Sequence, residues 1–304
     1  YLNTAIGYNS MLCNTTGTDN VAVGANSLRV ATSGCQNVAI GSSAMFSTIT
    51  AKRNVAVGSF ALYSNQTGYG NVAVGQSTLF QNKGSCNVAV GLVALNNNTT
   101  GCRNVAIGAT ALQSNTTGKN NVAVGVCALQ ANTGGRTNAA LGYWALQSNT
   151  VGLANTVVGT YGMMCNTCGA YNTSIGYGAL KLNTTGGRNV AVGLSGLCFN
   201  TTGCGNVAVG QYALLNNTVG NSNTAIGNCA GCTNTTGANN IMLGHNAQPS
   251  SATTSNEITL GSTAHTVFRL PGLQSGASSG HVLCYNGTSL VLAAASSGGA
   301  TNID

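Results

Sequence analysis

The residues able to carry out acid–base or metal chemistry are few in this 304-residue chain and lie far apart. The acids and histidines are Asp19, Glu257, Asp304, His245, His265 and His281. General acid–base catalysis needs two carboxylates close together or a histidine oriented by an acid, and calcium sites need several oxygen ligands. The sequence therefore predicts no enzyme activity, no catalytic residue, no cofactor and no metal site.

The 12 cysteines include two Cys-x-x-Cys pairs, Cys165–Cys168 and Cys229–Cys232. A structural zinc site needs a second pair of ligands at a matching spacing, and neither pair has one. The cysteines are more consistent with disulfides or with small apolar side chains.

Two other groups of side chains could bind a partner without reacting with it. The aromatic group comprises Tyr143, Trp144, Tyr161 and Tyr177, and the basic group comprises Lys52, Arg53, Arg103, Lys119, Arg136 and Arg188. Aromatic rings pack against the apolar faces of sugars, and a row of cations attracts anionic polymers. Whether either group forms a site depends on the elements that position it.

The composition excludes several classes of protein. Only 4% of residues are charged, the net charge is +7, and the chain has 43 glycines but 2 prolines. Disordered chains are rich in charge and proline, collagen has glycine at every third position, and a membrane span needs ~20 apolar residues. None of these fits, and the modest positive charge is no nucleic-acid signature. We therefore expect neither a nucleic-acid partner nor a membrane span in this segment.

The chain is a tandem repeat with a period of 17 residues. Its unit, represented by Asn104 to Asn120, reads Asn-Val-Ala-Val-Gly-x-x-Ala-Leu-x-x-Asn-Thr-Thr-Gly-x-x. The copies are marked by Gly7, Gly24, Gly41, Gly58, Gly75, Gly91, Gly108, Gly125, Gly142, Gly159, Gly176, Gly193, Gly210, Gly227, Gly244 and Gly261. Every interval is 17 except the step of 16 from Gly75 to Gly91. We number the positions of each repeat 1 to 17 from the Asn that precedes Val-Ala-Val-Gly.

A repeat of this length predicts one turn of a coil with two short strands and two tight corners. Val-Ala-Val alternates as a strand does, and the following Gly permits a corner. Asn-Thr-Thr-Gly supplies the second corner, where Asn bonds its own backbone and Gly tolerates positive φ. The fold class is therefore all-β, a parallel β-solenoid of about sixteen coils spaced by ~4.8 Å along a rod of roughly 75 Å. Rows of Asn and Thr should hydrogen-bond along its axis.

The apolar columns predict an assembly of several chains. Alanine between the two valines indicates a cramped interior. The two valine columns and the leucine column then offer more apolar surface than one thin rod can bury, and a long apolar stripe is typical of an interface. Cyclic symmetry is the usual way to close such an assembly.

The repeat positions place both binding groups on the surface. The aromatic group occupies positions 6 and 7 of three consecutive repeats, which predicts one patch for glycan recognition or a brace for a corner or an inter-chain seam. The basic group occupies positions 16 and 17 and lines one edge, which either contacts an anionic surface or only solubilises the rod. Stacking also predicts a disulfide between Cys86 and Cys102 on consecutive coils, and a second could bridge the single Asn-Thr-Thr-Gly corner that Cys198 and Cys204 flank.

Units such as Asn71–Gly75, Asn104–Gly108 and Asn223–Gly227 resemble the head repeats of YadA-like trimeric adhesins. That resemblance implies a left-handed β-roll formed by three chains, and hence a homotrimer. The longer unit, with Ala-Leu and Asn-Thr-Thr-Gly, looks more like repeats of bacteriophage tail-fibre proteins. The resemblance covers roughly Asn3 to Gly261 and implies a fibre or an adhesin.

Residues 1–261 are therefore expected to form the repeat shaft, and residues 262–304 a Gly/Ser-rich cap or junction segment. The tail is similar to segments that follow the shafts of phage fibres. The leading interpretation is a homotrimeric tail fibre of a virion, an extracellular structural protein whose partners are a host-surface polysaccharide or receptor and other fibre or virion proteins. The alternatives are a bacterial autotransporter-type adhesin head at the cell surface and, from the Thr pairs and low charge, an ice-binding β-solenoid.

Overall fold

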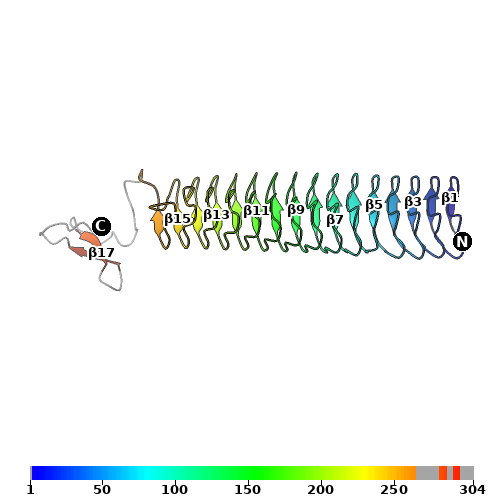
Figure 1. The fold of residues 1–304 in the computed structure, drawn as a ribbon, viewed down its shortest axis with the longest axis horizontal. Helices are drawn as coiled ribbons and strands as arrows, with labels where there is room; N and C mark the ends of the chain where they lie inside the picture. Colours follow the sequence, from blue (N-terminus) through cyan, green and yellow to red (C-terminus); the bar gives the residue numbers. More distant parts are fainter. Residues whose placement is uncertain (1, 265–280, 286–289, 295–304) are drawn as a thin grey trace. The chain divides into compact units, whose positions relative to one another are not determined.

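The computed structural model describes residues 2–264, 281–285 and 290–294, in two compact units, Tyr1–Ser262 and Thr263–Asp304. The first unit is a β-solenoid with one short strand in each coil (Figure 1). Its strands are β1 (Thr4–Ile6), β2 (Val21–Val23), β3 (Val38–Ile40), β4 (Val55–Val57), β5 (Val72–Val74), β6 (Val88–Val90), β7 (Val105–Ile107), β8 (Val122–Val124), β9 (Ala139–Leu141), β10 (Thr156–Val158), β11 (Thr173–Ile175), β12 (Val190–Val192), β13 (Val207–Val209), β14 (Thr224–Ile226), β15 (Ile241–Leu243) and β16 (Ile258–Leu260).

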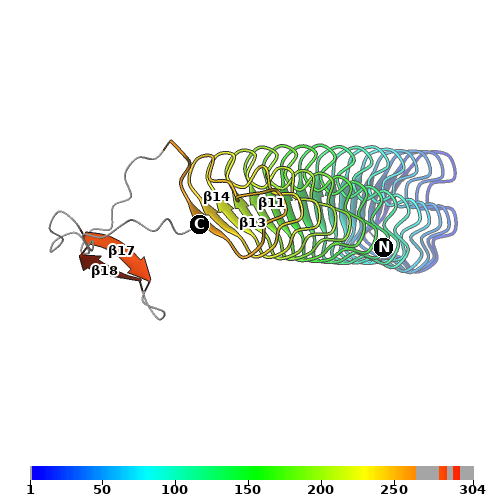
Figure 2. The same cartoon turned by 60° about the vertical axis from the view of Figure 1, so that its left-hand side comes forward.

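The strands form one parallel sheet of 16 strands in sequence order. Equivalent positions face each other, so that Val105 pairs with Val122 and Ala106 with Ala123. The register also holds at the 16-residue step, where Val72 pairs with Val88. The predicted parallel β-solenoid is therefore confirmed, and Figure 2 shows the coils following one another along the axis.

The return half of each coil is not the second strand that the sequence predicted. Positions 7 and 9 lie in the left-handed region, as at Thr110 (φ 56°) and Leu112 (φ 51°). This backbone curls too tightly for an extended strand, although it still bonds the next coil, since Leu112 N donates to Ala128 O at 3.0 Å. The prediction was wrong because leucine disfavours this conformation, so its side chain gives no signal for it.

The core is a narrow column of alanine and leucine. Ala106, Ala111 and Leu112, at positions 3, 8 and 9, are fully buried, and the same positions are buried in most other coils. The prediction of a cramped interior is confirmed, whereas the leucine column was wrongly counted as surface. Because the leucines fill the interior, the exposed apolar surface comes from positions 2 and 4 of the strands.

Substitutions within this core occur in compensating pairs. Position 3 holds Val157 where position 8 of the same coil is Gly162, and a Cβ at Gly162 would lie 2.6 Å from Val157 Cγ1. Position 3 holds Met242 where the preceding leucine is replaced by Gly231, and a Cβ there would lie 2.7 Å from Met242 Sδ. At these two places the interior volume is thus conserved, as a close-packed core requires.

Two buried rows of asparagine bind the coils along the axis, as the sequence predicted. At position 1, Asn104 Oδ1 accepts hydrogen bonds from the backbone N–H of Asn121 (3.0 Å) and from its Nδ2 (3.2 Å), and Asn121 Nδ2 also donates to Gly135 O in its own coil. At position 12, Asn115 Nδ2 donates to Asn98 Oδ1 at 2.7 Å. Each side chain therefore both closes its own coil and fastens it to a neighbour, so these buried polar groups are satisfied.

Both corner glycines are required, but for different reasons. Gly108 has φ 131°, and a Cβ there would lie 2.5 Å from Gly125 O. Gly118, at position 15, was expected to need positive φ; it has none, and instead a Cβ would collide with Asn115 Oδ1 and approach Gly135 O to 2.5 Å. Consistent with this, alanine replaces glycine at Ala51, in a coil where position 12 is Thr48 rather than asparagine.

The second unit contains strands β17 (His281–Tyr285) and β18 (Leu290–Ala294), which pair in antiparallel fashion. Most of the predicted cap or junction segment, including His265 and Asp304, lies outside the described residues. Within the described ranges, no helix is long and apolar enough to cross a membrane.

Candidate binding surfaces

The outer face of the sheet is a continuous apolar strip, which we call the valine face. It consists of repeat positions 2 and 4, which are the first and third residues of strands β1 to β16. Its central residues include Ile107, Leu141 and Ile175, whose side chains are 41%, 41% and 40% exposed. No charged residue occurs at these positions, and position 4 is aliphatic in every strand. Fifteen steps of ~4.8 Å make it about 70 Å long, which is far more extended than the scattered apolar residues of an ordinary surface.

The four predicted aromatic residues form one patch, as the repeat positions required. Tyr143 stacks on Trp144 with ring centroids 5.2 Å apart, and both meet the edge of Tyr161 at 5.7 and 5.8 Å. Tyr161 in turn contacts Tyr177 at 5.6 Å. We call these four residues the aromatic patch. Offset and edge-to-face contacts of this kind hold the rings in fixed orientations.

The aromatic patch combines exposed rings with one cation. Tyr143 is 42% exposed and Tyr177 is 55% exposed, while Trp144 and Tyr161 are half-buried between them. The Nζ atom of Lys181, at position 10 of the next coil, lies 5.5 Å from the centroid of Tyr161. Lys181 was missed because positions 7 and 10 were not known to lie side by side.

A second aromatic cluster was also missed by the sequence analysis. Phe46, Tyr63 and Phe80 stack at position 10 of consecutive coils, with centroids 5.1 and 5.0 Å apart, and Arg29 lies over Phe46 at 5.5 Å. These rings are half-buried and nearly parallel, so they act mainly as a ladder between coils. The signal was present in the sequence as three aromatic residues spaced by 17 residues.

The basic group is placed at positions 16 and 17, where the coils bond one another along one edge. Arg53 N donates to Cys35 O, Arg103 N to Ser85 O, and Arg188 N to Ala170 O. Lys119 and Arg136 share the edge, since their carbonyls accept from Thr137 N and Ala154 N. The structure groups only some of these cations: Lys52 and Arg53 line one hollow, and Arg103 lines the next.

The threonine corners use much of their hydrogen-bonding capacity internally. At position 13, Thr116 Oγ1 donates to Thr133 O at 3.0 Å, and Thr133 Oγ1 donates to Thr150 O at 3.2 Å. Position 14 is exposed, as at Thr117, but its row is interrupted by Val151 and Cys168. This is not the regular flat array of free hydroxyls on which the ice-binding alternative depends.

The predicted disulfides do not form. The thiols of Cys86, Cys102, Cys198 and Cys204 are free. Cys86 lies at position 17 because its repeat is one residue short, while Cys102 lies at position 16, so the two are not stacked in one column. Cys198 is half-buried at position 10, and burial raises the pKa of its thiol, whereas Cys204 Sγ accepts a hydrogen bond from Gly187 N at the same position of the preceding coil.

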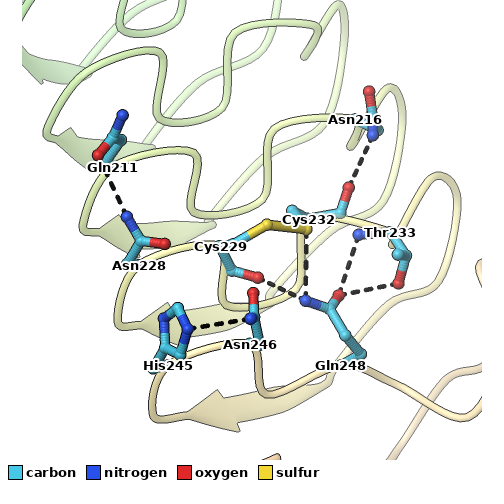
Figure 3. Close-up of a disulfide and its surroundings, with 9 residues drawn as sticks. All are labelled: Gln211, Asn216, Asn228, Cys229, Cys232, Thr233, His245, Asn246 and Gln248. Atoms are coloured by element: carbon cyan, nitrogen blue, oxygen red, sulfur yellow. Dashed lines mark hydrogen bonds between the residues drawn. A yellow bond between two sulfur atoms is a disulfide. The ribbon is translucent and has the colours of Figure 1, made fainter.

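Among the described residues, a disulfide joins Cys229 to Cys232, at positions 7 and 10 of one coil (Figure 3). Cys165 and Cys168 have the same sequence spacing but occupy positions 11 and 14 and remain free. The bonded pair flanks Gly231, where the core leucine is missing. Gln248 Nε2 contacts Cys232 Sγ at 3.3 Å, and its Oε1 accepts from Thr233 (Figure 3). The bridge therefore braces a turn that lacks its usual core anchor.

Glu257 ends the position-1 row, where the preceding coils have asparagine. Its backbone N–H donates to Asn240 Oδ1 at 2.9 Å, as an asparagine would. Hydrogen bonds from Ser250 N–H and Oγ hold the pKa of the Glu257 carboxyl below its usual value. Among the described residues, no three His, Cys, Asp or Glu side chains gather as a metal-binding group. The acid therefore has a structural role at the end of the row.

Comparison of the chain with models of known protein families, with curated proteins and with solved structures finds no match. The surfaces described above must therefore carry the functional argument on their own.

Proposed function

We propose that this chain is the shaft of a homotrimeric, left-handed β-roll fibre of the phage tail-fibre type, and that the fibre contacts a host surface. The observation that carries this proposal is the valine face. It extends the full length of the solenoid, contains no charge, and exposes about two-fifths of its larger central side chains, Ile107, Leu141 and Ile175. Burying such a strip against other copies is strongly favourable because each buried methylene group contributes about 0.8 kcal/mol.

The sequence supports a fibre made of identical chains. Because every strand presents an aliphatic side chain at position 4 and an uncharged one at position 2, a second copy aligned along the axis meets similar chemistry at each step, and three such faces close around a threefold axis. The resemblance to trimeric adhesin heads and to phage fibres supports the number three. A bacterial adhesin head shares this architecture and is the alternative for biological origin.

Association through the valine face predicts a defined mass in solution. The wild-type chain should sediment at three times its 30.2 kDa chain mass. Ile107→Lys combined with Leu141→Lys should dissociate the trimer while leaving the β-sheet circular dichroism unchanged, because each lysine would put a desolvated charge into the interface. Thr117→Lys, on an exposed corner, is the matched control and should leave the mass unchanged. A wild-type chain that stays monomeric at micromolar concentration would contradict the proposal.

Host contact is assigned to the aromatic patch. Exposed rings held in fixed orientations beside Lys181 suit a sugar ring that bears a polar or anionic substituent. Trp144→Ala should reduce binding to immobilised bacterial surface polysaccharides about tenfold, since it removes the largest stacking surface. Tyr212→Ala is the control, because Tyr212 is also at position 7 but lies outside the patch. Equal binding by both variants and the wild type would leave these rings with a structural role only.

A further inference from the structure

The 16-residue repeat interrupts the edge of the solenoid. Its corner reads Asn82-Lys83-Gly84, one residue shorter than the usual Asn-Thr-Thr-Gly. In neighbouring coils the amides of positions 13 and 14 both donate to the next coil, as Ile49 N and Thr50 N do to Gln66 O. Within the described solenoid, the Gln66 and Thr67 amides make no such bond, because the shortened corner does not bring a carbonyl opposite them. Two backbone N–H donors are thus left without an acceptor at the shortened repeat.

Two adjoining hollows open at the same place. The first, of about 310 Å³, is lined by Thr50, Lys52, Arg53, Thr67 and Tyr69. The second, of about 300 Å³, is lined by Tyr69, Lys83, Gly84, Ser85, Cys86, Thr100, Cys102 and Arg103. Tyr69 belongs to both and is 58% exposed. We call the two hollows together the notch.

The notch concentrates positive charge without compensation. Lys52, Arg53, Lys83 and Arg103 are four of the ten basic residues of the chain, and no acid occurs between Asn20 and Asn256. Arg53 Nε is held by Gln36 Oε1 at 3.1 Å, a neutral partner that orients the guanidinium and leaves its charge unpaired. Hydroxyls of Thr50, Thr67, Ser85 and Thr100 add neutral hydrogen-bonding groups around the cations.

We propose that the notch binds an acidic polysaccharide, a polymer carrying sulfate or carboxylate groups. The cations occupy three of four successive coils and are spread over about 14 Å along the axis rather than converging on one point, which fits an extended polyanion better than a single phosphate. The free amides and hydroxyls are donors for its charged groups, and the Tyr69 ring offers a stacking surface for a sugar. The choice of a polysaccharide over a nucleic acid rests on the proposed host-surface function.

The probe is heparin, a sulfated polysaccharide, titrated into the full-length chain at low salt. Lys52→Gln, Lys83→Gln and Arg103→Gln combined should weaken binding about tenfold or more, and added salt should weaken the wild-type complex, because the contacts are electrostatic. Lys119→Gln, Arg136→Gln and Arg188→Gln combined are the matched control, since they remove the same charge from the same edge outside the notch. Equal losses in both triple variants would mean attraction by net charge and would overturn the proposal.

A second variant tests the shape of the notch with all its cations retained. Inserting one threonine between Lys83 and Gly84 restores a four-residue corner and a 17-residue repeat, and should give the Gln66 and Thr67 amides a carbonyl partner. The insertion should weaken heparin binding while preserving or raising the melting temperature. Undiminished binding by this variant would overturn the proposal, as would tighter binding of double-stranded DNA than of heparin at equal salt. The mass of the protein in solution is measured independently of heparin binding. A monomer that still binds heparin at the notch would therefore contradict the proposed fibre but support the proposed binding site.

Discussion

At the scale of the residue, the asparagine rows explain why so polar an interior is stable. A buried amide is costly when unpaired but favourable when its donors and acceptor are all used, and the regular repeat supplies the same partners in every coil. The position-12 row fails near the N-terminus, where Ala31 and Thr48 replace asparagine. Among the described residues, Asn14 Oδ1 and Thr48 Oγ1 are the buried side-chain polar atoms without a hydrogen-bond partner.

One substitution should satisfy both of these atoms. In Ala31→Asn, the new Nδ2 would donate to Asn14 Oδ1 and Gly34 O, and the new Oδ1 would accept from Thr48 Oγ1. Since each hydrogen bond contributes about 0.5–1.5 kcal/mol net, the free energy of unfolding should rise by about 1–2 kcal/mol. Thermal and denaturant unfolding would measure it. Ala31→Val, which adds volume without donors, is the control, and a stabilisation of equal size in that variant would show that packing, not the amide row, is responsible.

At the scale of the element, the sequence predicted the strands, their register and the two corners, because these features depend on alternation and on period. It did not predict the return segment, where Leu112 and its equivalents adopt positive φ. That conformation is unfavourable for a leucine alone and is maintained by burial of the side chain and by bonds to the next coil. For the same reason the sequence could not show that positions 7 and 10 are neighbours, so it missed both the Cys229–Cys232 disulfide and the contact of Lys181 with the aromatic patch.

The neighbouring relation of positions 7 and 10 can be tested in another coil. Cys198 is at position 10, and Ser195 is at position 7 with φ 53°, close to the 55° of Cys229. Ser195→Cys should therefore form a disulfide with Cys198 in air, as Cys229 does with Cys232. Thiol titration of the denatured protein would then find one thiol fewer than in the wild type. Ser77→Cys, also at position 7 but with Phe80 at position 10, should show one more, and the same gain in Ser195→Cys would refute the equivalence of the coils.

At the scale of the whole molecule, two kinds of surface follow from the repeat. The valine face is aliphatic at position 4 of every strand and uncharged throughout, and it therefore suits self-association. The aromatic patch and the notch occur where the repeat varies or shortens, and therefore suit a specific partner. The sequence predicted the aromatic patch because its residues occupy two adjacent columns, positions 6 and 7, of three consecutive repeats. It did not predict the notch, since the hollows arise from the one-residue deletion and from the backbone donors that the deletion leaves without a carbonyl.

The central claim is that the valine face is the contact between copies of the chain. The most direct measurement places a photoreactive phenylalanine analogue at Ile107 in one protein and at Thr117 in another, irradiates each, and separates the products on a denaturing gel. Because Ile107 lies on the valine face and Thr117 on an exposed corner, the account predicts cross-linked species up to three chains from position 107 and only single chains from position 117. Cross-links from position 117 with none from position 107 would contradict it.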